Sequence, residues 1–313
     1  MKGILLALSA FAVFSLHDVI VKLLAAYSVF QVAFFAMLFG YVPFSIARIF
    51  DGREITLRPV HPKLILLRSV LVTTSLCCAF LGFSLLPMVQ VYVLIFMTPL
   101  IISVLAIPVL GEKIHVFRWL TIVLGLIGIV IVLRPAPDNL QLGHLFALIA
   151  AFASAGAAII SRKIGHIENA ATMMLAPMIM NILVSGSLLY FVYQPMPLGD
   201  LALMFLIGVM ALLGHLLLLS AYRSAPASLV APMQYSQLIW ALIYGYLFFD
   251  ETIDGLILLG SAITICSGLL MVWRETRVSV NQPILRTRNM RMVSTAPVVN
   301  SEGDQQRIKA GML

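Results

Sequence analysis

The sequence is poor in charge and in cysteine. Only 11% of its 313 residues are Asp, Glu, Lys or Arg, and ten of these charged residues follow position 273. Soluble domains carry about 25% charged residues, so this composition excludes an ordinary soluble fold. The chain has three cysteines, which excludes a small scaffold held together by disulfides.

Apolar residues are abundant instead. They make up 61% of the chain, and the mean hydropathy is +1.05. Runs of about 20 apolar residues, the length that spans a bilayer, fit between the charged positions. The run from Leu120 to Leu133 does not alternate between polar and apolar residues, which excludes a transmembrane β-barrel. We therefore predict an all-α integral membrane protein with ten transmembrane helices, at 3–24, 30–49, 64–83, 88–110, 117–134, 142–161, 170–192, 200–221, 226–249 and 255–273.

Basic residues are distributed unevenly over the connections between these helices. If the N-terminus is cytoplasmic, eighteen of the 20 Lys and Arg residues lie inside, and only Lys22 and Arg134 lie outside. Such an asymmetry sets the orientation of a membrane protein. It predicts a multi-pass membrane protein with both termini in the cytoplasm. The short loops and the lack of glycosylation sequons fit the bacterial cytoplasmic (inner) membrane. Because the basic residues form no single patch, we expect no binding of nucleic acid.

The two halves of the chain repeat one another. A shift of 139 positions places Pro87 on Pro226 and Val91 on Val230 without a gap. We therefore expect a first repeat at 1–137, a second at 138–273, and a basic, disordered cytoplasmic tail at 274–313. Each repeat holds five helices, and an odd number forces the second repeat to enter the membrane from the opposite side. Inverted repeats of this kind are typical of secondary transporters.

Two paired segments, GFSLLPMVQVYVLIFMTPLIISVLAIPVLGEKI (82–114) and AYRSAPASLVAPMQYSQLIWALIYGYLFFDETI (221–253), carry a family resemblance. Each has a turn with Pro, a helix rich in small residues, and a Gly-Glu or Asp-Glu pair at its far end. The chain resembles the EamA type of the drug/metabolite transporter superfamily over about residues 3–273. The segment SLHDVIVKLLAAYSVFQVAFF (15–35) further resembles a bacterial branch that includes importers of S-adenosylmethionine and riboflavin. The resemblance implies a ten-helix transporter with helices four and nine at a central cavity.

Asp18 is the one acid well inside a predicted span. An ionisable group within the membrane is a functional hypothesis by default, so Asp18 is our candidate for proton or cation coupling. The alternative is an ion pair with Lys22, which lies one helical turn further on. Both interpretations remain open at this stage.

The predicted ninth helix has the densest set of polar and aromatic residues, among them Ser236. Gln234, Gln237 and Tyr244 fall on one helical stripe, with Trp240 beside it. Side-chain amides cannot face lipid without a partner, so we expect this stripe to bind substrate. Hydrogen bonding between packed helices is the alternative. The further candidates for substrate binding are Thr98, which matches Gln237 in the repeat, Thr73 on helix three and His215 on helix eight.

Glu112 and Glu251 occupy matching positions in the two repeats, and we expect both acids to be structural. An alternative function is an intramembrane lipid-modifying enzyme that uses a cluster of Asp250, Glu251 and Asp254. The sequence lacks the motifs of metalloproteases, serine hydrolases and nucleotide-binding proteins, so we predict that the protein is not an enzyme. We also predict no metal and no cofactor.

These observations favour a secondary transporter that moves a small metabolite by alternating access through a central cavity. The direction of transport, import or export, is left open. The expected partners are the small-molecule metabolite and the lipid bilayer. A homodimer is compatible with the sequence but is not required by it.

Overall fold

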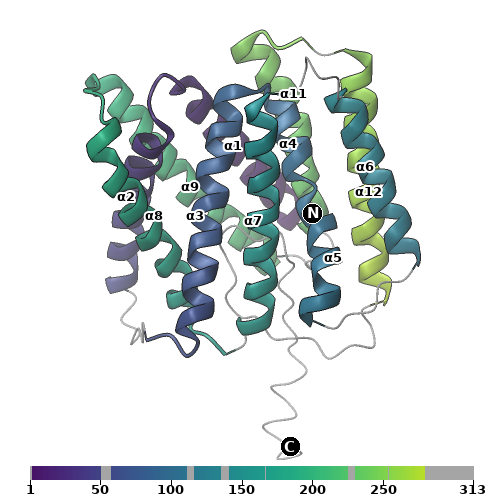
Figure 1. The fold of residues 1–313 in the computed structure, drawn as a ribbon, viewed down its shortest axis with the longest axis horizontal. Helices are drawn as coiled ribbons and strands as arrows, with labels where there is room; N and C mark the ends of the chain where they lie inside the picture. Colours follow the sequence, from purple (N-terminus) through teal and green to yellow (C-terminus); the bar gives the residue numbers. More distant parts are fainter. Residues whose placement is uncertain are drawn as a thin grey trace, which may run out of the picture.

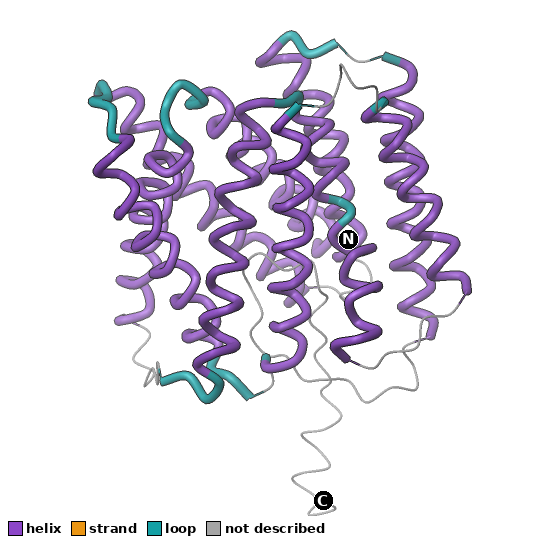
Figure 2. The backbone as a smooth tube through the Cα atoms, in the orientation of Figure 1, coloured by secondary structure: helices purple, strands orange, loops and turns teal. Residues whose placement is uncertain are grey.

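A computed structural model describes residues 2–50, 58–110, 116–134, 141–165, 167–224, 230–252 and 254–278. All regular structure in these ranges is helical (Figure 2). The helices are α1 (Lys2–Leu23), α2 (Val29–Phe50), α3 (Pro62–Leu85), α4 (Met88–Ile95), α5 (Thr98–Leu110), α6 (Val116–Leu133), α7 (Leu142–Ile164), α8 (Ala170–Val192), α9 (Leu198–Ser224), η1 (Ala231–Tyr235), α11 (Ser236–Phe249) and α12 (Gly255–Val278).

The bundle is built from membrane-spanning segments. In the described part of the chain, six segments are long and apolar enough to cross a bilayer: Lys2–Leu23, Pro62–Leu85, Met88–Val109, Leu142–Ile164, Thr172–Val192 and Leu198–Ala221. Shorter apolar helices cover Val29–Gly40, Trp119–Leu133 and Gly255–Leu270. The predicted all-α membrane fold is therefore confirmed.

The helix predicted at 88–110 is broken in two. Pro99 has no backbone N–H, so it cannot bond to the carbonyl of Ile95 four residues earlier. The hydroxyl of Thr98 donates to that carbonyl at 2.6 Å instead. Phe96 and Met97 form a turn, which separates α4 from α5. The span predicted at 88–110 is thus one apolar segment, Met88–Val109, that this turn divides into two helices.

The helix predicted at 226–249 also differs from the structure. Residues 225–229 lie outside the described part, and the chain then forms the 3-10 helix η1 before α11 begins at Ser236. Gln234 therefore lies in η1 and does not share the α-helical register of Gln237. At the other end of the repeat, α12 continues to Val278, so positions 274–278 of the predicted disordered tail are helical.

The packing of the helices follows an inverted repeat. α3 packs along α7, and its counterpart α9 packs along α1. α6 and α12, the fifth helix of each half, pack side by side at one edge of the bundle, at the right of Figure 1. α2 and α8 pair in the same way on the opposite side. Each of these contacts is thus matched by one between the corresponding helices of the other half.

Glycines allow α6 and α12 to approach each other closely. A Cβ atom added to Gly260 would lie 2.6 Å from the carbonyl oxygen of Gly128, and one added to Gly128 would lie 2.8 Å from the carbonyl oxygen of Gly260. Small residues at such crossings bring helix backbones into van der Waals contact in membranes. The two peripheral helices are therefore held as one unit.

The largest apolar cluster of the described residues joins helices from both halves. It includes Val19 of α1, Phe83 of α3, Tyr92 of α4, Ile129 of α6 and Leu238 of α11. We call the end of the bundle where α1, α3 and α11 end and α4 begins, uppermost in Figure 1, the upper end. The cluster fixes the polar groups described next.

Candidate functional site

Lys22, near the end of α1, joins the two halves at the upper end. Its ammonium group forms an ion pair with Glu251, the second residue after α11, and donates to the carbonyl of Leu86 at 2.8 Å. It also lies 4.7 Å from the centre of the Phe249 ring. The side chains of Lys22 and Glu251 are only 15% and 13% exposed, so the pair is screened weakly by water.

Glu251 has a second role at the same place. Its two carboxylate oxygens accept the backbone N–H of Met88 at 3.1 and 3.0 Å. Met88 is the first residue of α4, whose free N–H groups carry the positive end of the helix dipole. One carboxylate therefore ties the end of α11 to the end of α1 and the beginning of α4. Glu112, its match in the first repeat, lies outside the described residues.

Asp18 does not pair with Lys22, so the ion pair considered from the sequence was wrong. Its carboxylate accepts the hydroxyl of Tyr92 and lies 2.8 Å from Nδ1 of His17. The Tyr92 hydroxyl is also 3.3 Å from Oγ of Ser15. Within the described part of the chain, no Lys or Arg contacts Asp18. Among the described residues, His17 is the one basic side chain that contacts this carboxylate.

Aromatic rings fix the hydroxyl that Asp18 accepts. The Tyr92 ring packs edge-on to Phe83 at 5.2 Å and lies 6.1 Å from Phe96, between ring centres. Phe96 in turn lies 5.3 Å from the ring of Tyr235 in η1. This row of rings crosses from α3 through α4 to η1. It connects the surroundings of Asp18 to η1, which leads into α11.

A polar and aromatic face runs along α11. The rings of Trp240 and Tyr244 are stacked, with centres 5.7 Å apart and planes 25° apart. Ser236 lies one turn before Trp240 on the same face. The indole Nε1 of Trp240 and the hydroxyl of Ser236 are buried, and neither has a hydrogen-bond partner in the structure. Buried polar groups are normally paired, so this face has unused hydrogen-bonding capacity.

The remaining predicted residues are spread over the bundle. Gln234 and Gln237 are partly buried, and neither amide bonds to another described residue. Thr73 is buried with its hydroxyl unpaired. Thr98 uses its hydroxyl on the Ile95 carbonyl, while Nδ1 of His215 lies 2.6 Å from the carbonyl oxygen of Ala211. Substrate binding by these residues stays a prediction.

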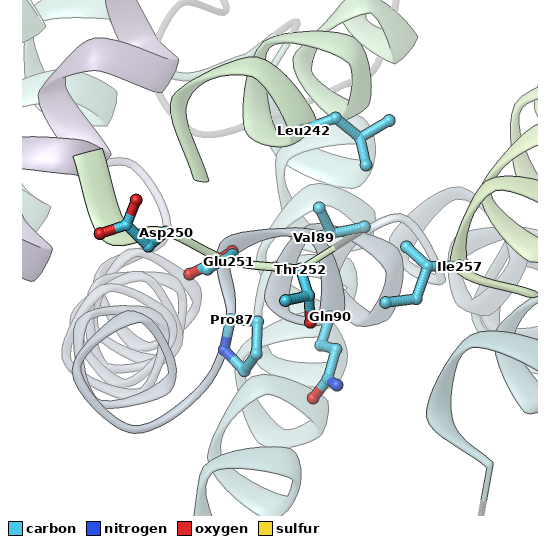
Figure 3. Close-up of a pocket in the computed structure, with 8 residues that line it drawn as sticks. All are labelled: Pro87, Val89, Gln90, Leu242, Asp250, Glu251, Thr252 and Ile257. Carbon is cyan, nitrogen blue, oxygen red and sulfur yellow. The ribbon is translucent and has the colours of Figure 1, made fainter. Parts of the chain in front are cut away.

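A pocket of about 360 Å³ opens at the upper end. It is lined by Pro87, Val89, Gln90, Leu242, Asp250, Glu251, Thr252 and Ile257. Figure 3 shows Asp250 and Ile257 on opposite sides of this pocket, with the Gln90 amide pointing away from Leu242. The pocket contains Glu251 but none of the predicted substrate-binding residues. The candidate site at Asp18 and the α11 face thus lies apart from this pocket and stays a prediction.

Two acids near helix ends, Asp254 and Asp200, have partners of their own. The N–H of Ile257, at 2.9 Å, and the guanidinium of Arg134 hold the pKa of Asp254 below its ordinary value. Asp200 accepts the hydroxyl of Tyr27, and this hydrogen bond raises the pKa of that phenol. The described residues contain no group of three or more His, Cys, Asp or Glu that could hold a metal ion. Of the acids considered for an enzyme, Glu251 and Asp254 thus bind separate partners.

The inverted helical fold and its polar interior define a multi-pass membrane transporter. Residues 1–134 and 141–273 match the EamA-like transporter family, and the chain belongs to that family. A solved crystal structure of 15% sequence identity has the same fold, with a TM-score of 0.63. The match covers 88% of this chain and 99% of the solved one.

Similar proteins of known name are bacterial transporters. An S-adenosylmethionine uptake transporter of Rickettsia bellii is 29% identical over 79% of this chain and 85% of its own length. A pseudopaline exporter of Pseudomonas aeruginosa is 26% identical over 87% of this chain and 93% of its own length. A riboflavin transporter of Rhizobium johnstonii is 26% identical over 71% and 74%, respectively. These names support small-metabolite transport, and none supports the enzyme alternative.

Proposed function

We propose that the protein is a secondary transporter of the bacterial inner membrane that moves a small, ring-bearing, positively charged metabolite by alternating access. Both termini face the cytoplasm, as the distribution of Lys and Arg predicts. The upper end of the bundle is then the outer end.

The observation that carries the proposal is the set of side chains that contact Asp18. Its neighbours donate hydrogen bonds, but the nearby ammonium group of Lys22 is held by Glu251. A carboxylate inside a membrane span is costly unless a cation balances it. A proton or a positively charged cargo supplies that balance. Asp18 is therefore the site at which cargo or coupling ion is bound.

The α11 face supports a cargo with a planar ring. Stacked Trp240 and Tyr244 offer a flat aromatic surface, and the free indole N–H and the Ser236 hydroxyl can bond to ring heteroatoms. A cationic metabolite with a heterocyclic ring combines both requirements. The S-adenosylmethionine and riboflavin named for the relatives both carry such rings, and S-adenosylmethionine also carries positive charge.

The packing supports a conformation that is closed at the outer end. α1 contacts α3 there, through Lys22 to the Leu86 carbonyl and through the rings of His17 and Phe80, 5.9 Å apart. The inverted counterpart is a contact of α7 with α9, and the described residues of these helices form no contact of similar extent. This asymmetry is that of an inward-facing transporter.

Reconstitution tests the proposal. Purified protein in liposomes is exposed to radiolabelled S-adenosylmethionine, riboflavin and a neutral sugar, with and without an imposed pH gradient. We expect saturable uptake of the cationic compound above protein-free liposomes and none of the sugar. Equal, leak-level flux of all three compounds would contradict the proposed function.

A further inference from the structure

Lys22 has two acidic groups within reach, one in each half of the protein. Asp18 precedes it by one turn on α1, in the acid-before-base order that favours an ion pair along a helix. Glu251 follows α11 in the second half and holds the ammonium group in this structure. Because one ammonium group cannot serve both carboxylates fully, the two acids compete for it.

Opening of the outer end has to break the contact with Glu251. That carboxylate ties the end of α11 to Lys22 and to the N–H of Met88, so α11 cannot separate from α1 and α4 while the bonds remain. Separation leaves Lys22 with a carbonyl and an aromatic ring. An unpaired charge in such surroundings is costly. Asp18 is the acid that can pair with the ammonium group of Lys22 without movement of the backbone of α1.

We infer that Lys22 is a positioning residue that couples the occupancy of Asp18 to closure of the outer end. When Asp18 binds neither a proton nor cargo, it is a second partner for Lys22. The free-energy cost of breaking the Lys22–Glu251 pair is then small, and the outer end opens. When Asp18 holds a proton or a cationic cargo, that partner is lost and the Lys22–Glu251 pair is favoured. A loaded transporter therefore closes. This inference rests on the proposed role of Asp18.

Other ionisable groups of the described residues lie near Asp18. His17 on α1 contacts Asp18 and lies near His215 on α9. Tyr92 on α4 donates to Asp18 and lies near Tyr244 on α11. The two phenols stay neutral at physiological pH and supply hydrogen bonds only.

The test measures the distance between spin labels at the outer end, without any substrate. Labels are placed at Ala26→Cys, in the loop after α1, and at Gly255→Cys, at the start of α12, with the three native cysteines replaced. Both positions are exposed, and a Cβ at Gly255 would meet no other atom within 4 Å. The short-distance population reports the closed outer end.

Asp18→Asn imitates a permanently neutralised Asp18, and Glu251→Gln removes the competing acid. We expect the ratio of closed to open protein to rise about fivefold in Asp18→Asn and to fall about fivefold in Glu251→Gln, a common size for coupling between sites. Both effects disappear when Lys22→Gln is added, and Lys22→Arg restores them. Lys22→Met serves in place of Lys22→Gln if that variant does not fold. Lys63→Gln, which removes an exposed lysine, leaves the ratio as in the unaltered protein.

The inference is overturned if Asp18→Asn changes the ratio equally with Lys22 present and absent. It is also overturned if Asp18→Asn leaves the ratio unchanged. Because the distances are measured without cargo, they are independent of transport. Failure of all metabolites to move in liposomes would count against the proposed function, whereas a Lys22-independent distance change would count against the coupling alone.

Discussion

Lys22 pairs with Glu251, 229 positions further along the chain, and not with Asp18, which stands one turn before it on the same helix. The pair links the first half of the protein to the second at the end where α1, α3 and α11 terminate. It leaves Asp18 with Tyr92 and His17. We propose that the division of charge between these two acids governs what the interior binds.

The ion pair has a measurable effect on stability. Glu251→Ala leaves the ammonium group of Lys22 and the N–H of Met88 without their acceptor. We expect the free energy of unfolding to fall by about 3 kcal/mol, as when one partner of a buried pair is removed. Glu251→Gln keeps an acceptor for the Met88 N–H and should lose less. Unfolding in detergent micelles measures both, and equal losses would contradict the capping role of Glu251.

The aromatic face of α11 should determine affinity for cargo. We expect Trp240→Ala to weaken binding about fivefold, since an aromatic contact is worth about 1 kcal/mol beyond burial of its area. Trp240→Phe keeps a ring but loses the indole N–H, so its affinity should be intermediate. Concentration dependence of flux in liposomes gives these values. Leu247→Ala, which removes a side chain that is 64% exposed, is the control, and an equal loss there would refute the assignment.

Variants of Thr98 distinguish a structural role of its hydroxyl from a role in binding cargo. Thr98→Val removes the hydroxyl that bonds to the Ile95 carbonyl, and we expect a loss of about 1 kcal/mol of stability. Thr98→Ser keeps the hydroxyl and should retain that stability. Thermal unfolding measures the stability of each variant. The concentration dependence of flux measures its affinity for cargo. A loss of affinity in Thr98→Val with unchanged stability would show that the hydroxyl serves the cargo instead.

The crossing of α6 and α12 should not tolerate a side chain at its centre. In Gly260→Ala the new Cβ would lie 2.6 Å from the carbonyl oxygen of Gly128, so the helices must move apart. We expect a loss of about 2 kcal/mol, typical of overpacking. Gly255→Ala is the matched control because a Cβ there meets nothing within 4 Å. Equal stability of the two variants would mean that the crossing is looser than described.

Asp254 should make stability depend on pH under acidic conditions. Its pKa is lowered in the folded protein, chiefly by the N–H of Ile257, so folding favours the ionised carboxylate. The contribution is therefore fully present above the ordinary pKa of 3.8 and is lost as the pH falls below it. Asp254→Asn should flatten the unfolding temperature over that range. An unchanged pH profile in this variant would exclude Asp254 as the source.

The sequence predicted the helical membrane fold because the length of its apolar runs and the match between its two halves can be measured without a structure. It also placed Trp240 and Tyr244 together, since their spacing of four follows the helical period. The partner of Lys22 could not be obtained in this way. A spacing of four suggested Asp18, whereas the observed partner, Glu251, is brought near by packing between the halves. Local pattern cannot rank a local contact against one formed by tertiary structure.

The break before Pro99 was within reach of the sequence. Proline removes a backbone N–H and restricts the residue before it, so an interruption near Thr98 could have been expected. The free hydroxyl of Ser236 was harder to single out. Ser236 stands four residues before Trp240, but only burial without a partner distinguishes it from the many serines that bond to their own helix.

The central claim is that Asp18 is the interior group that binds a proton or a cationic cargo. Uptake of radiolabelled S-adenosylmethionine into liposomes, compared between the unaltered protein and Asp18→Asn over a range of pH, tests it most directly. We predict pH-dependent uptake by the unaltered protein, and uptake by Asp18→Asn that is reduced and independent of pH. Identical uptake by both proteins at every pH would contradict the claim.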